Sequence, residues 1–194
     1  NEVGAKWFSA HDRLVISCIA KHNGVLTDVS DGALMYFSTV EDAIAFGFEY
    51  RKKMKIHKFP FKSRIGIHFG DMLIVKTAEH LVRANHKRIG LEGIGKNIAA
   101  RTMSICGPNQ ILLSKDAYIK FKARHNNNRF IPKNALIALV GLYKFKGVHA
   151  PEQVYAIGTR TEHMQPPPDG EKVKRIGGAK KIKTRMKHKR WSEI

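Results

Sequence analysis

The chain has 194 residues, of which 43% are hydrophobic, enough for the core of one domain of about 150 residues plus a tail. Its formal net charge of +19 favours polyanionic partners such as nucleotides, nucleic acid or an acidic membrane surface. The two cysteines lack metal-ligand spacing, and so few cysteines exclude a disulfide scaffold. The chain has no apolar run of about 18 residues and no signal peptide, which excludes a transmembrane protein. Together these features predict a cytoplasmic protein.

The spacing of apolar residues predicts helices and strands separated by clear turn signals. Asp31-Gly32 closes a first hairpin and Gly70-Asp71 closes a second. The predicted elements, in chain order, are a helix over 6–21, a hairpin over 24–37, a helix over 38–54 with a capping box at Ser38 and Glu41, a hairpin over 61–75, a loop over 76–92, a helix over 95–106, a strand over 110–114, a helix capped by Ser114 and running to 121, and closing strands over 135–147 and 152–158.

This order of elements predicts an α+β sandwich, in which one layer of helices covers a largely antiparallel sheet. The folded domain is expected over 1–158. From Thr159 the composition changes to prolines, glycines and ten Lys or Arg between 172 and 190, which predicts a linker and a basic, disordered tail over 159–194. The tail is most simply a solvated segment, and contact with nucleic acid or acidic lipid is the alternative.

Three segments carry residues suited to phosphoryl chemistry. Asp31 offers a carboxylate to a hard divalent cation such as Mg²⁺. Asn97 and Arg101 are four residues apart, so a helix places both on one face, where they can meet a phosphate or a sugar. Lys144 and Lys146 lie on one side of a predicted strand. A metal, a fixed arginine and a lysine for polyphosphate are the parts that such chemistry needs.

The chain resembles the class III nucleotidyl cyclase catalytic domain, the adenylate/guanylate cyclase family, over residues 7–157. The matching segments follow the family's order and spacing: HDRLVISCIAKHNGVLTDVSDGALMYFSTVEDAIAFGFEY, RIGIHFGD, GIGKNIAARTMSICGPNQILLS and LYKFKGVHAPEQVYAIG. The resemblance implies a ferredoxin-like sandwich. It also implies a homodimer, because in this family the metal residues and the Asn/Arg pair come from opposite subunits.

The resemblance implies a role for four residues. Asp31 matches a metal-binding aspartate, Asn97 the asparagine that orients the ribose, and Arg101 the arginine that stabilises charge at the α-phosphate. Lys146 matches the lysine that binds the distal phosphates. The implied reaction converts a nucleoside triphosphate, with ATP favoured, into a 3′,5′-cyclic nucleotide and pyrophosphate, with Mg²⁺ or Mn²⁺ as cofactor.

The chain departs from the family's pattern at three places. The first metal-binding aspartate of the family lies on a strand before the first helix, and this chain begins at that helix. The substrate-binding positions that read the base hold Thr27 instead of a lysine and Gly90 instead of an aspartate. These departures keep open the alternative of a catalytically inactive regulatory or nucleotide-sensing module of the same fold. A second alternative, a nucleic-acid-binding protein acting through the basic tail, rests on charge alone.

Overall fold

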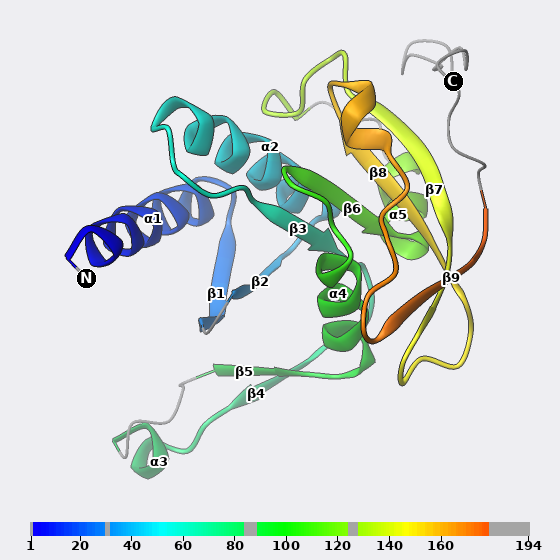
Figure 1. Cartoon of the computed structure of the whole chain (residues 1–194). Coiled ribbons are helices and arrows are strands. Elements are labelled where there is room, and N and C mark those ends of the chain that lie inside the picture. Colours follow the sequence, from blue (N-terminus) through cyan, green and yellow to red (C-terminus); the bar gives the residue numbers. More distant parts are fainter. Residues whose placement is uncertain (1, 30–31, 84–88, 124–127, 179–194) are drawn as a thin grey trace.

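Five strands form the central sheet of the computed structural model, which describes residues 2–29, 32–83, 89–123 and 128–178 (Figure 1). The described residues form these strands, inside and outside the central sheet: β1 (Gly24–Val29), β2 (Ala33–Phe37), β3 (Arg64–Ile67), β4 (Leu73–Lys76), β5 (Ile89–Glu92), β6 (Gln110–Ser114), β7 (Leu136–Phe145), β8 (Glu152–Gly158) and β9 (Val173–Gly177). The helices are α1 (Glu2–Lys21), α2 (Val40–Ile56), α3 (Glu79–Arg83), α4 (Ile94–Ser104), α5 (Lys115–Lys122) and the 3-10 helix η1 (Thr161–Met164). Among the described residues, no helix is long and apolar enough to cross a membrane.

The central sheet has the strand order β3-β6-β8-β7-β9, and the pairs β1–β2 and β4–β5 each form a separate two-stranded ladder. All of these pairs are antiparallel except β3–β6, which is parallel. The predicted α+β class is therefore confirmed.

Helices cover both faces of the central sheet. Ile111 and Leu113 of β6 pack with Ile44 of α2, whereas Leu112 between them packs with Ile98 of α4. All five residues of β6 are buried, as expected for a strand covered on both sides. The prediction of one layer of helices is therefore incomplete: α4 forms a second layer on the other face of the sheet, and this helix carries two of the candidate site residues.

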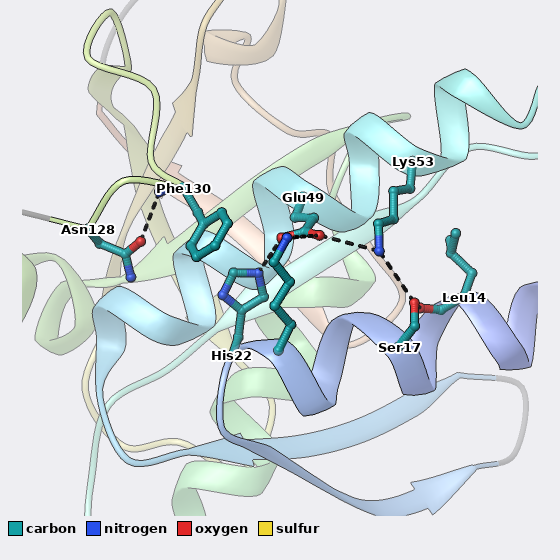
Figure 2. A network of polar contacts seen from close by, with 8 residues as sticks. Leu14, Ser17, His22, Glu49, Lys53, Asn128 and Phe130 are labelled. Carbon is teal, nitrogen blue, oxygen red and sulfur yellow. Dashed lines mark hydrogen bonds and ion pairs between the residues drawn. The ribbon is translucent and has the colours of Figure 1, made fainter.

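A buried ionic network joins α1 to α2 (Figure 2). Glu49, 8% exposed, accepts hydrogen bonds from Lys21 Nζ at 2.9 Å and His22 Nε2 at 2.8 Å, and Lys53 Nζ lies 3.3 Å from it. Burial acts to raise the pKa of Glu49, but hydrogen bonds from these three residues lower it to about 2. The Phe130 ring lies edge-on against His22. The network fixes the end of α1, and hence the start of β1.

The second predicted hairpin is wrong. β3 pairs with β6, and β4 pairs with β5 instead of turning back on β3. The predicted loop over 76–92 is wrong in part, because it contains α3 and β5, while residues 84–88 lie outside the described ranges. Alternation of apolar residues identifies strands but not their partners, and β5 is only four residues long, too short for a clear period.

The caps of two helices follow the sequence signals closely. Thr39 caps α2: its hydroxyl accepts from the Asp42 amide at 3.1 Å and donates to Asp42 Oδ2 at 2.8 Å. The N-cap is thus Thr39, one residue later than the predicted Ser38, and the predicted partner Glu41 is replaced by Asp42. Ser114 caps α5 as predicted, by accepting from the Ala117 amide.

Residues 159–178, expected to be linker and disordered tail, instead complete the sheet. Met164 and Val173 are fully buried, and the Tyr143 hydroxyl donates to the Pro167 carbonyl at 2.9 Å. β9 pairs with β7 along the outer edge of the sheet (Figure 1). The folded unit therefore extends through Gly178, and the expected tail at 179–194 lies outside the described residues.

Candidate functional site

The position of α4 is set by a glycine in β3. A side chain at Gly66 would place its Cβ 2.7 Å from the Ala99 carbonyl oxygen and in collision with the Met103 amide nitrogen. Both of these are backbone atoms of α4, so they cannot rotate away. The backbones of β3 and α4 are therefore in direct contact, and Gly66 sets the distance between the helix and the sheet.

The first turn of α4 rests on two side chains. A Cβ at Gly95 would lie 2.8 Å from Met72 Sδ and 3.1 Å from His68 Cδ2. His68 is itself held by a 2.8 Å hydrogen bond between its Nδ1 and Ser114 Oγ, and burial lowers its pKa. These glycine contacts were not predicted from the sequence, although a glycine inside a strand, as at Gly66, is a signal of close backbone approach.

The predicted pair Asn97 and Arg101 lies on α4, one turn apart and on the same side of the helix. Asn97 is exposed and Arg101 is half-buried. The Nε–H group of Arg101 is buried and has no hydrogen-bond partner among the described residues. A buried donor without a partner costs about 1–3 kcal/mol, and a phosphate oxygen would satisfy it. Arg101 therefore suits an anionic ligand.

The two predicted base-reading positions lie on segments that pack together, since β1 contacts β5. Thr27 is the extra residue of a β-bulge: Leu26 pairs with Met35 and the next paired residue is Asp28. The buried Thr27 hydroxyl donates to the Leu34 carbonyl at 3.1 Å. Gly90 lies opposite Val75 and has no side chain. Thr27 thus uses its donor inside the hairpin, and Gly90 supplies no polar group.

Lys146 is exposed and directly follows β7, where its amide donates to the Lys172 carbonyl at 2.8 Å. The preceding Phe145 belongs to the same buried cluster as Ile98 of α4. Asp31 lies outside the described residues. Among the residues that are described, no group of three or more His, Cys, Asp or Glu could hold a metal. The metal site remains a prediction.

The fold is that of class III adenylate and guanylate cyclase catalytic domains, as the sequence motifs predicted. The adenylyl cyclase CyaB from P. aeruginosa has 18% identity and a TM-score of 0.66, with 81% of this chain and 83% of that chain covered. An adenylate/guanylate cyclase/hydrolase from Silicibacter pomeroyi has 22% identity and a TM-score of 0.60, with 80% and 85% covered. The guanylate cyclase domain from Catenaria anguillulae in complex with GTP has 16% identity and a TM-score of 0.56, with 80% and 81% covered.

No protein-family profile and no curated protein sequence matches the chain. The likeness to these solved structures, at 16–22% identity, establishes the fold.

Proposed function

We propose that the protein is a nucleotidyl cyclase, with a nucleoside triphosphate as substrate and ATP favoured. The observation that carries the proposal is Arg101, whose buried Nε–H has no partner on a helix seated against the sheet by Gly66. In the reaction, the ribose 3′-oxygen bonds to the α-phosphorus, the bond to the β-phosphate oxygen breaks, and the 3′-hydroxyl proton is released. The products are a 3′,5′-cyclic nucleotide and pyrophosphate.

The proposed role of each candidate residue follows from its position in the fold. Arg101 donates to the α-phosphate, where negative charge develops as the bonds change. Asn97, one turn earlier on the exposed side of α4, orients the ribose so that its 3′-oxygen approaches in line. Lys146, beyond the end of β7, holds the distal phosphates as a mobile point charge.

Mg²⁺ or Mn²⁺ is the cofactor we propose, with Asp31 as a ligand. A carboxylate in a turn is the oxygen ligand that these hard cations prefer. The cation would neutralise phosphate charge and favour the deprotonated nucleophile.

We propose that the protein forms a homodimer through the arm formed by β4, α3 and β5. This arm projects away from the central sheet (Figure 1). Leu73 is 65% exposed, and Ile74 and Val75 are exposed beside it. Three consecutive exposed aliphatic residues on a protruding strand are typical of a surface that is covered by a partner. A second copy of this chain is the partner we propose.

The test is incubation of the full-length gene product with each of the four nucleoside triphosphates and Mn²⁺ or Mg²⁺, with detection of the cyclic product and pyrophosphate. Arg101→Ala is expected to lower turnover by about 10²-fold or more, because it removes donors to the developing charge. Arg13→Ala, which removes an exposed arginine of α1, is the matched control and should leave turnover unchanged. No cyclic product from any of the four, with the dimer verified by sedimentation, would reject the proposal.

A nucleotide-sensing module without turnover is the second candidate. It is favoured by Thr27 and Gly90, because neither offers a free polar group with which to read a base. Calorimetry distinguishes the two: binding of a nucleoside triphosphate that Arg101→Ala weakens, without any product, supports the sensor.

A further inference from the structure

Four lysines come together where β9 joins β7. Lys144 and Lys174 are directly opposite each other in the ladder, and the Lys146 amide donates to the Lys172 carbonyl at 2.8 Å. All four lysines are exposed. Strand geometry places cross-strand neighbours about 5 Å apart and alternate residues about 7 Å apart. We call these four residues the lysine array. Lys172 and Lys174 belong to the segment over 159–194 that was expected to be a linker and a basic, disordered tail.

The lysine array concentrates like charge, with Glu171, which precedes Lys172, and Asp169 as its acidic neighbours in the chain. No ion pair joins any of the four side chains to another residue in the described ranges. The nearby Asp169 is engaged elsewhere, since its Oδ1 accepts from the Arg175 amide at 2.8 Å. Like charges directly opposite in a ladder are destabilising. An external anion would relieve this repulsion.

We infer that the lysine array binds the phosphate backbone of double-stranded nucleic acid. A single-stranded ligand would need aromatic side chains on which its bases stack. Beside the array, however, Tyr143 and Phe145 are buried on the opposite face of β7. A membrane surface would need large apolar anchors among the lysines. On β9 only Ile176, 52% exposed, lies beside them. A compact, purely cationic array fits the regularly spaced phosphates of a duplex.

This inference does not depend on nucleotidyl cyclase activity, although the lysine array shares Lys146 with the proposed nucleotide site. The test substitutions are therefore confined to Lys144 and Lys174, which have no proposed role in the cyclase reaction. The array lies at the paired strands β7 and β9, whereas the basic run after Gly178 lies outside the described residues. Its test therefore compares variants of the full chain, so that the basic run contributes equally to every measurement.

The test is binding of a fluorescent DNA duplex of about 20 base pairs, followed by anisotropy from about 50 to about 200 mM salt. Each phosphate contact contributes about 0.9 to the slope of log K against log salt. Lys144→Ala with Lys174→Ala should reduce the steepness of this slope by about 2 and weaken binding about tenfold or more at the lowest salt. Lys144→Arg with Lys174→Arg keeps the charges and should keep the slope.

The matched control is Lys52→Ala with Lys55→Ala, which removes the same charge from the exposed side of α2. Equal weakening by the array and control variants would overturn the inference, because it would show a response to net charge alone. Array-dependent binding to anionic vesicles without duplex binding would also overturn it, in favour of a membrane surface.

A second variant separates binding from folding. Lys174→Glu places a carboxylate opposite Lys144 and should raise the melting temperature by about 1–3 °C, while it weakens duplex binding. A raised melting temperature with unchanged duplex binding would contradict the inference.

Discussion

At Glu49, burial and hydrogen bonding act on the same carboxyl group in opposite directions. Burial raises its pKa, but the bonds from Lys21, His22 and Lys53 prevail and hold it at about 2, below the ordinary 4.5. A carboxyl whose pKa is lower in the folded than in the unfolded chain stabilises the fold above the unfolded pKa. That stability is lost as the pH falls from about 5 towards 2.

Glu49→Gln is therefore expected to lower the free energy of unfolding at pH 7 by about 1–3 kcal/mol and to flatten its dependence on pH below about pH 5. The measurement is urea denaturation at a series of pH values from about 3 to 7. Asp12→Asn, which removes an exposed carboxylate of α1, serves as the control and should keep the acid dependence. An unchanged acid dependence in Glu49→Gln would show that the network does not carry this effect.

Single residues also mark the limit of sequence reasoning. Asn97 and Arg101 could be predicted, since residues four apart on a helix share one face whatever the helix packs on. The partners of Glu49 could not, because His22 and Glu49 are 27 residues apart and meet only when α1 packs on α2. Thr27 was correctly placed in a strand, but its bulge depends on the register with β2.

Among the elements, α4 depends most directly on its neighbour β3. The Cβ of a residue larger than glycine at position 66 would collide with backbone atoms of Ala99 and Met103. The helix would have to move away from the sheet, and it would carry Arg101 with it.

Gly66→Ala should accordingly lower the melting temperature by about 2–12 °C, the effect of about 1–3 kcal/mol of overpacking in a chain of this size. It should also lower turnover by about ten- to a hundredfold, because a displacement of about 1 Å disturbs the reacting geometry. Calorimetry and the cyclase assay measure the two effects. Gly4→Ala is the matched control, since nothing lies within 4 Å of a Cβ there, and it should lower neither.

The elements themselves were largely predictable, because α1, α2 and α5 each have an apolar stripe or a clear cap. Strand partners were not. β3 and β6 are separated in the sequence by the whole arm, and a parallel pair leaves no turn signal between its strands. β9 was missed because a proline run and a high lysine content resemble a linker, whereas only Val173 and Ile176 suggest a strand.

For the molecule as a whole, the main expectation is association through the arm. Leu73 is exposed in the single chain, so charging it should leave the monomer's stability unchanged. In a dimer that buries the arm, the same change places an ammonium group in an apolar interface.

Leu73→Lys is expected to raise the dimer dissociation constant about tenfold or more and to lower product formation in parallel. Sedimentation velocity over a range of protein concentrations measures the first effect, and the cyclase assay measures the second. Ile119→Lys, at a 50% exposed position on α5, is the control and should change neither. A Leu73→Lys variant that remains dimeric would exclude the arm as the interface.

The family-type fold was predictable from several short motifs in register, whereas the substrate base was not. The motifs specify how the backbone folds around α4, and the structure confirms that arrangement. At the two positions where base recognition was predicted, Thr27 and Gly90, the chain supplies one engaged hydroxyl and no side chain.

The arm has a further consequence for how such a protein can change over evolutionary time. The β4 and β5 ladder bonds join only these two strands, and all four residues of β4 are exposed. Substitutions at these exposed positions of β4 are thus expected to have little effect on the buried strands that support α4. The proposed dimer surface can therefore diverge rapidly between descendants of one ancestor, while the helix carrying Arg101 is inherited with little alteration.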